Sequence, residues 1–361
     1  MSALVIGGTG PTGPYVVNGL LALGHETSIL HTGRHETELI PEHVEHIHTD
    51  PFDAEATASA IGDRAFDVAV VAYGRLRNLA EVLKGRTGHL VTIGGVGVYR
   101  GFGSPDDVFP SGLRVPHPAT AELVGDGEAF GKLRRIRETE ERVVELHPKA
   151  IHLRYPQLYG PRQLLPREWP IVRRCLDKRP FLIVPDGGLT VKSQSWVENA
   201  AHATVLASTA PPAALGNVYN VADDTALSIA QIAETIADEL NHPLALVSLP
   251  ADVAPSTRPL LTSWSNTHRV LDTRPLKNDL GYSDLVDPAE AWRLAARHLA
   301  EHPLQYGGPT ELRLQDPFDY EAEDALLTLW DQLRPKLQGV HWKVEPGYTA
   351  AYVGNRPNPG G

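Results

Sequence analysis

Three glycines stand at intervals of three residues near the start of the chain, at Gly7, Gly10 and Gly13. They follow the apolar run 4–6, which is typical of a short buried strand, and they open an apolar helix over 15–21. The first glycine allows a sharp turn, the second lets backbone approach a diphosphate without a Cβ in the way, and the third allows close packing of helix on strand. The start of that helix then faces the bound anion. We therefore predict that this turn binds the diphosphate of a dinucleotide.

Residues after later apolar runs complete the predicted cofactor site, because parallel sheets bind ligands at the carboxyl ends of their strands. No acidic residue follows the second run to bind a ribose, whereas Arg34 offers a guanidinium that can pair with a 2′-phosphate, so NADP is preferred to NAD. The alternative for Arg34 is a solvated loop arginine. Asp50, after the third run, is placed to reach the adenine amino group. The predicted cofactor-binding residues are Gly7, Thr9, Gly10, Pro11, Thr12, Gly13, Thr32, Arg34, Asp50, Pro51, Ala72, Tyr73, Gly74, Ile93, Gly94, Pro156 and Leu158.

Alternating apolar runs and helical segments indicate the elements that must position these residues. The predicted strands are 4–6, 27–30, 47–48, 68–73, 90–93 and 151–155, and the helices between them include 54–61, 76–84 and 133–146. This alternation is typical of the α/β class, with a Rossmann-type doubly wound parallel sheet. Between 101 and 131 the chain is rich in glycine and proline, which predicts a long functional loop.

The second half of the chain predicts a smaller C-terminal α/β substrate lobe. Helices are expected at 196–207 and 228–240 around a strand at 218–221, and a last pair at 288–299 and 320–333. We expect a dinucleotide-binding domain at 1–160, with late strands returning from the second half, a substrate lobe at 161–303, and a C-terminal helix with a Pro/Gly-rich tail at 304–361. A basic excess over 154–179 favours an anionic substrate near this lobe, although a solvated helix face is an equal alternative.

Bulk composition excludes several classes of partner. The chain of 361 residues carries a formal charge of −11, which disfavours nucleic acid and anionic membranes, and no apolar run is long enough to span a bilayer. A single cysteine excludes an internal disulfide and a cysteine-based metal cluster, and it suits the cytoplasm. The close histidines His43, His46 and His48 indicate a solvated strand edge, so no metal site is predicted. We expect a cytoplasmic protein with a small-molecule substrate, and a homodimer is the candidate assembly.

Five motifs together resemble the extended short-chain dehydrogenase/reductase family, which includes NAD-dependent sugar epimerases and dehydratases. They are GGTGPTG at 7–13, RYPQLYGPR at 154–162, WVENAAHA at 196–203, VYNV at 218–221 and the segment 272–282 with its Leu280-Gly281-Tyr282. The resemblance covers the chain from Ser2 to about Pro303. It implies a Rossmann domain, a smaller substrate domain and a nicotinamide cofactor between them. We expect substrate contacts at Gly95, Tyr155, Arg162 and Trp196.

The sequence departs from this family where proton transfer is expected. The family has a Ser or Thr at the end of the fifth strand and a Tyr-x-x-x-Lys on the next helix. Here Gly94 and Gly95 occupy the first place, and no tyrosine lies between Tyr99 and Tyr155.

Three registers remain open on the helix. They place Phe130 and Arg134, Glu128 and Lys132, or Lys132 and Ile136 in the Tyr and Lys positions. The acidic flanks at Glu122 and 138–140 favour the third register.

Two residues are the main candidates to replace the lost tyrosine. Lys132 could exchange a proton if burial and the neighbouring Arg134 and Arg135 lowered its pKa from the ordinary ~10.4. Tyr99 offers a phenol from the loop, with a packing role as its alternative, and Glu122 is a weaker candidate.

These residues favour an NAD(P)-dependent oxidoreductase or epimerase-type enzyme acting on a small polar carbonyl or alcohol, anionic or sugar-nucleotide-like in character, through a non-standard proton-transfer residue. Two alternatives stay open. One is a non-redox isomerase or lyase that retains a nicotinamide cofactor. The other is a non-enzymatic NAD(P) sensor resembling the NmrA-like regulators.

Overall fold

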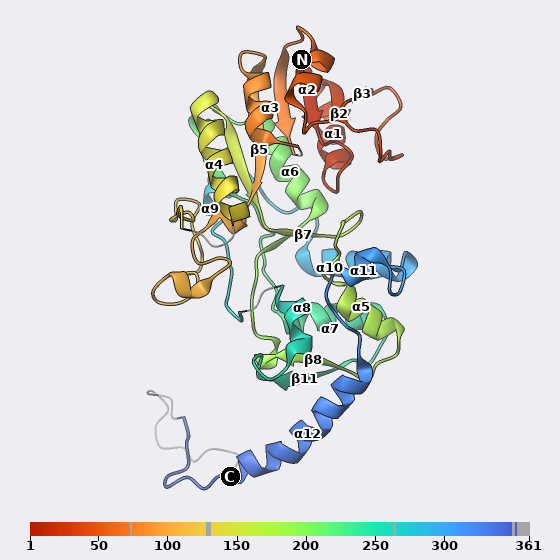
Figure 1. The fold of residues 1–361 in the computed structure, drawn as a ribbon, viewed down its shortest axis with the longest axis vertical. Coiled ribbons are helices and arrows are strands. Elements are labelled where there is room, and N and C mark those ends of the chain that lie inside the picture. The colour runs from red at the N-terminus through yellow and green to blue at the C-terminus, as the bar shows by residue number, and fades with distance from the viewer. Residues whose placement is uncertain (73, 128–130, 263–264, 349–350, 352–361) are drawn as a thin grey trace. The chain divides into compact units, whose positions relative to one another are not determined.

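The central element of the computed structural model is a seven-stranded parallel sheet, in the order β10-β6-β5-β4-β1-β2-β3 (Figure 1). The structure describes residues 1–72, 74–127, 131–262, 265–348 and 351. The strands are β1 (Ser2–Ile6), β2 (Glu26–His31), β3 (Glu45–His48), β4 (Phe66–Val71), β5 (Thr87–Gly95), β6 (Ile151–Tyr155) and β10 (Val218–Asn220). The predicted Rossmann-type fold is confirmed, and the strand order reverses beside β1, where such sheets bind ligands.

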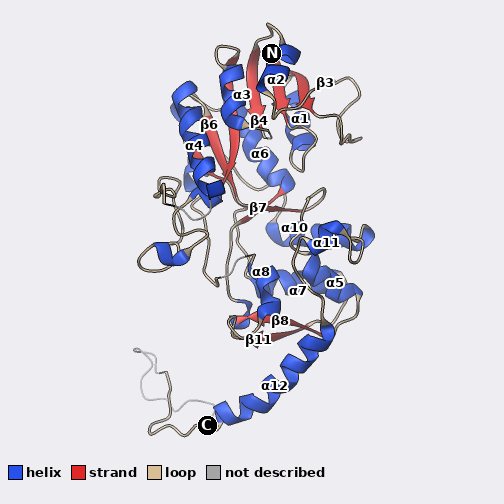
Figure 2. Cartoon of the chain, viewed as in Figure 1, coloured by secondary structure: helices blue, strands red, loops and turns tan. Residues whose placement is uncertain are grey.

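Helices cover both faces of this sheet (Figure 2). On β1, Ala3 and Val5 face a core shared with α1 (Gly13–Ala22) and α6 (Val197–Ser208). Their neighbours Leu4 and Ile6 face the opposite core, which is shared with α2 (Ala54–Ile61), α3 (Leu76–Leu83) and α4 (Gly131–Leu146). Because side chains alternate along a strand, the continuous apolar runs of the sequence supply both cores at once.

The strand register brings the carboxyl ends of the strands to one edge of the sheet. Ile6 of β1 pairs with Leu30 of β2 and with Val71 of β4. Gly95 at the end of β5 pairs with Tyr155 at the end of β6. The predicted cofactor residues that follow these strands therefore lie along a single edge, as the doubly wound topology requires.

The second half contains the helices predicted at 228–240 and 288–299, and it adds shorter helices and two small sheets that periodicity did not predict. One sheet pairs β7 (Gln157–Tyr159) with β9 (Gln194–Trp196), and the other pairs β8 (Phe181–Pro185) with β11 (Ala245–Leu249). The helices are α5 (Trp169–Leu176), α7 (Ile229–Glu239), α8 (Arg258–Leu261), α9 (Arg274–Leu280), α10 (Pro288–Glu301) and α11 (Pro309–Leu312). Because β7 begins two residues after β6 ends, this sheet continues directly from the edge where the cofactor residues gather.

The chain forms two units, residues 1–317 and 318–361. The second contains α12 (Tyr320–Gln338), whose N-cap Asp319 accepts a hydrogen bond from the backbone N–H of Ala322. No helix among the described residues has the length and apolar character needed to cross a membrane. The predicted boundaries at residues 160 and 303 stay predictions.

Candidate functional site

The glycine-rich turn after β1 has the conformation expected of a diphosphate cradle. Gly7 has a φ of 94°, which favours glycine, and its N–H donates to the Leu30 carbonyl at 3.0 Å. A Cβ on Gly13 would overlap the backbone of Gly8, whereas a Cβ on Gly10 would meet only the Gly7 carbonyl oxygen, at 3.5 Å. Gly13 is thus required for the close packing of α1 on the turn, whereas the space beside Gly10 is open. Thr12 caps α1 without a side-chain hydrogen bond, and no acidic residue lies in the first turn, so the helix start suits an anion.

Residues after the other strands are placed at the same edge but differ in exposure. Thr32 is half-buried and Arg34 is exposed after β2. Asp50 is exposed, and its Oδ1 accepts a hydrogen bond from the backbone N–H of Phe52 at 2.9 Å. Gly74 has a φ of 94°, and a Cβ there would lie 2.7 Å from the Pro51 carbonyl oxygen. Tyr73 lies outside the described residues, and the cofactor contacts of this set stay predictions.

A pocket of about 430 Å³ opens at the ends of β5 and β6, where the nicotinamide end of a dinucleotide would reach. Gly95, Tyr155 and Pro156, three of the predicted site residues, line it together. The Tyr155 hydroxyl points elsewhere, because it donates to the Ala200 carbonyl at 2.7 Å. The ring and backbone of Tyr155, and not its hydroxyl, therefore line the pocket.

Lys192 is the cation of this pocket that the sequence analysis missed. Its Nζ donates to the carbonyl oxygens of Leu260 at 2.8 Å and Leu261 at 3.2 Å, and to Oγ1 of Thr262 at 3.2 Å. Burial lowers the pKa of Lys192 to about 7, with the nearby charges of Arg269 and Arg167 acting in the same direction. The three donors of this ammonium are thus directed at protein oxygens, and burial favours its neutral form.

A smaller inner cavity of about 30 Å³ adjoins the pocket and shares Gln157, Lys192, Gln194 and Thr262 with it. Glu168 also lines this inner cavity, and its Oε2 has no hydrogen-bond partner. Burial raises the pKa of Glu168 to about 7. The cavity is large enough for one water molecule.

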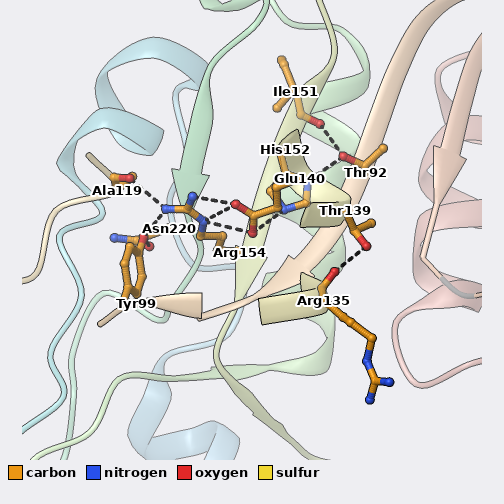
Figure 3. Close-up of polar contacts among 10 residues, drawn as sticks. All are labelled: Thr92, Tyr99, Ala119, Arg135, Thr139, Glu140, Ile151, His152, Arg154 and Asn220. Carbon is orange, nitrogen blue, oxygen red and sulfur yellow. Dashed lines mark hydrogen bonds and ion pairs between the residues drawn. The ribbon is translucent and has the colours of Figure 1, made fainter. Parts of the chain in front are cut away.

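Behind the pocket, a buried polar network fills the space beside the end of β5 (Figure 3). Arg154 lies between Tyr99 and Glu140 in Figure 3, and its Nη2 donates to Glu140 Oε2 at 2.7 Å. His152 Nε2 lies 3.0 Å from Glu140 Oε1. Burial alone would raise the pKa of Glu140, but His152 and Arg154 outweigh burial and hold this pKa below its usual value. A Cβ on Gly94 would overlap the imidazole of His152, which explains why no hydroxyl-bearing side chain stands there.

Of the three predicted proton-transfer residues, none is among the described residues that line the pocket. Tyr99 is fully buried, its hydroxyl donates to Asn220 Oδ1 at 2.5 Å and accepts from Arg154 Nη1 at 2.9 Å, and burial raises its pKa. Lys132 is exposed in the first turn of α4. Glu122 is exposed and accepts from Arg100 Nη1 at 2.7 Å. Leu133, the residue after Lys132, would be in contact with a Cβ on the pocket residue Gly97.

Two of the predicted substrate residues contact other parts of the fold. Arg162 donates from Nη2 to the Thr9 carbonyl at 2.8 Å and from Nη1 to Thr37 Oγ1 at 2.5 Å, so it holds the glycine-rich turn. Trp196 is buried, and a Cβ on Gly160 would overlap its ring. Leu158 packs against the core that contains α1 and α6. Two residues of the alternative helix registers, Glu128 and Phe130, lie outside the described residues.

Comparison with known proteins supports the architecture. No family model matches the chain. A Streptomyces protein described as 3-diazoavenalumate denitrifying reductase is 29% identical over 295 residues, which cover 77% of this chain and 93% of that protein.

Two solved structures illustrate the shared fold. A UDP-galactose 4-epimerase has a TM-score of 0.61 at 20% identity, covering 84% of this chain and 100% of that one. The Bordetella bronchiseptica enzyme WbmH, solved in complex with NAD+, has a TM-score of 0.64 at 14% identity, covering 84% and 99%. These structures confirm the predicted Rossmann-type α/β fold.

Proposed function

Starting from this fold, we propose that the chain is an NAD(P)H-dependent reductase of a small anionic substrate, bound in the pocket at the ends of β5 and β6. The observation that carries the proposal is the lining of that pocket, whose described residues include the cations Lys192 and Arg269 and no carboxylate. The reductase among the relatives matches this chain over 93% of its own length, which supports reduction rather than epimerisation.

The residues of the cradle fit a dinucleotide. Gly10 leaves backbone open to a diphosphate, and the N–H groups at the start of α1 meet its charge. A reduced nicotinamide bound along this edge supplies a hydride. Gly95 and Pro156, at the ends of β5 and β6, line the pocket that would hold it.

Charge in the pocket favours an anionic substrate. The described lining residues include two cations, Lys192 and Arg269, and no Asp or Glu. Arg269 Nε donates to the Phe102 carbonyl at 3.0 Å, which anchors the guanidinium at the pocket wall. Two cations without a lining carboxylate bind a carboxylate or phosphate better than a neutral sugar hydroxyl.

A finer proposal concerns the substrate's leaving group. The relative's description names a diazo carboxylate. When hydride replaces a diazonium group on an arene, one C–H bond forms, the C–N bond breaks, and its electron pair leaves with dinitrogen. No alkoxide forms, so no proton has to be delivered. This chemistry fits a pocket whose β5 wall has Gly95 in place of a hydroxyl and whose one lining tyrosine has its phenol engaged elsewhere.

The experiment pairs two probes of matched shape. Purified protein with NADPH or NADH is given diazotised 3-aminobenzoate or 3-formylbenzoate, with a protein-free reaction subtracted because diazonium salts react slowly by themselves. We expect nicotinamide oxidation, dinitrogen and benzoate in equal amounts from the first probe. Turnover of the aldehyde alone would keep the reductase and reject the diazo substrate. Turnover of neither probe would reject the reductase for aromatic carboxylates.

Variants of Lys192 test one cation of the lining that carries the proposal. Lys192→Gln should raise KM about 10- to 100-fold, the usual value of a hydrogen bond to a charged group, whereas Lys192→Arg should retain most binding. Since the ammonium is lost above pH 7, KM of the unmodified protein should rise as pH rises through about 7. Lys84→Gln, at an exposed position on the end of α3, is the control. An unchanged KM in Lys192→Gln would remove Lys192 from the site.

A further inference from the structure

Three histidines and a glutamate meet at the carboxyl ends of β2 and β3, outside the pocket described above. His31 pairs with His48 in the register of these parallel strands, and His46 stands two residues before His48 on the same face. Glu36 reaches them from the loop 32–44 that connects the two strands. One ligand atom from each of the four residues lies within 4.8 Å of the others. The sequence analysis predicted only an exposed edge at His46 and His48, because His31 and Glu36 join the pair through the fold.

The distances within this group match a tetrahedral metal site. Zinc bonds nitrogen and oxygen ligands at about 2.0–2.1 Å, so the edges of its coordination tetrahedron are about 3.3 Å. Nε2 of His31 lies 3.2 Å from Nδ1 of His46 and 3.7 Å from Oε1 of Glu36. The other Glu36 distances are 3.1 Å from Oε2 to Nδ1 of His46 and 3.3 Å from Oε1 to Nε2 of His48. These four separations, two of them from Oε1 of Glu36 and one from its Oε2, thus lie within about 0.4 Å of that edge length.

The charges at this site favour a cation. A carboxylate contacts all three imidazoles, so the group carries the negative charge that a metal cation requires.

We propose that His31, Glu36, His46 and His48 form a zinc site. Three imidazole nitrogens and one carboxylate oxygen in a tetrahedral arrangement suit Zn²⁺ better than Mg²⁺ or Ca²⁺, which take oxygen ligands in larger numbers. Four protein ligands close the coordination sphere, so the ion is structural and fastens the loop 32–44 to the sheet. The ion takes no part in the proposed reductase chemistry, but the loop that it fastens carries Thr32 and Arg34 of the predicted cofactor site.

Metal coordination would break one hydrogen bond that the structure contains. The Gly33 N–H lies 3.3 Å from Nδ1 of His31 and donates to it. A metal on Nε2 leaves the ring proton on Nδ1, so this long contact must open. Gly33 has a φ of 73°, and a Cβ there would meet only the ring of His48, so the loop has room to adjust.

The test uses Zn²⁺ and Co²⁺ alone, with full-length protein that carries no histidine tag and has been stripped with EDTA and exchanged into chelator-free buffer. Calorimetry should show one Zn²⁺ per chain. Co²⁺ should give the intense visible absorption of a tetrahedral complex. His46→Ala and Glu36→Gln should each weaken Zn²⁺ binding by more than ~100-fold, beyond the loss caused by an outer-shell partner. His43→Ala, an exposed histidine of the same loop, should bind like the unmodified protein.

Each outcome decides the proposal. Binding that survives both His46→Ala and Glu36→Gln, or the weak absorption of octahedral Co²⁺, would overturn it, and so would no binding to the unmodified protein. Circular dichroism of the variants separates ligand loss from unfolding. If one variant fails to fold, the other and His48→Ala, which alters an exposed side chain, still report on the site.

Discussion

A substitution that breaks the buried ion pair of Arg154 with Glu140 should lower the free energy of unfolding. Both side chains are less than 10% exposed, and Glu140 accepts from Arg154 Nη2 at 2.7 Å and from its Nε at 3.2 Å. Glu140→Gln removes the negative charge and turns an amide N–H₂ toward groups that are themselves donors, Arg154 or His152. Breaking a buried pair on one side costs about 3–5 kcal/mol. We expect that loss in the free energy of unfolding, which is a large share of the total for a natural protein.

Urea unfolding at pH 7, followed by circular dichroism, measures this loss from the transition midpoint at unchanged slope. Glu145→Gln on the same helix is the matched control, because Glu145 is exposed and its pair with Arg142 should contribute less than about 1 kcal/mol. The double variant Glu140→Leu with Arg154→Met should recover stability relative to Glu140→Gln alone. A loss below about 1 kcal/mol in Glu140→Gln would refute the reasoning.

Three further predictions concern the cofactor edge and the inner cavity. Gly10→Ala should keep the melting temperature but weaken dinucleotide binding measured by calorimetry. Gly13→Ala should lower the melting temperature, because a Cβ on Gly13, unlike one on Gly10, overlaps backbone. Equal changes of melting temperature and of affinity in the two variants would contradict the role of this turn as a diphosphate cradle. Arg34→Ala should reduce affinity for NADP and leave NAD unchanged, and the same affinities in both proteins would exclude a 2′-phosphate contact. The pKa of Glu168 is raised to about 7, so the carboxyl destabilises the fold as pH rises from about 4.5 to 7, and Glu168→Gln should remove about 3 kcal/mol of the stability difference between pH 5 and pH 8. Parallel pH profiles of unfolding would show that the Glu168 carboxyl is not buried as described.

Sequence patterns predicted the central sheet closely, because each strand is marked by a short apolar run of neighbouring residues. Apolar runs supply both cores, and the glycine spacing of 7–13 coincides with the turn from β1 to α1. The pocket was harder to predict. Lys192 meets Arg269 through an isolated bridge between segments 77 residues apart, and no periodicity marks either one. The available signal was the alternation of Lys192, Gln194 and Trp196 in an extended segment, which places the first two on one face.

The prediction of a replacement for the lost tyrosine shows the same limit. Tyr99 was selected for its chemistry and its position after the fifth strand, but burial and two partners decide what its hydroxyl does. These partners are Arg154 of β6 and Asn220 of β10, which lie 55 and 121 residues further along the chain than Tyr99.

Gly94 also bears on how this chain could be redesigned. A serine placed there to imitate the related dehydrogenases would collide with His152 and loosen the hold of Glu140 on Arg154. A variant with a serine at position 94 therefore also needs substitutions of His152, Glu140 and Arg154.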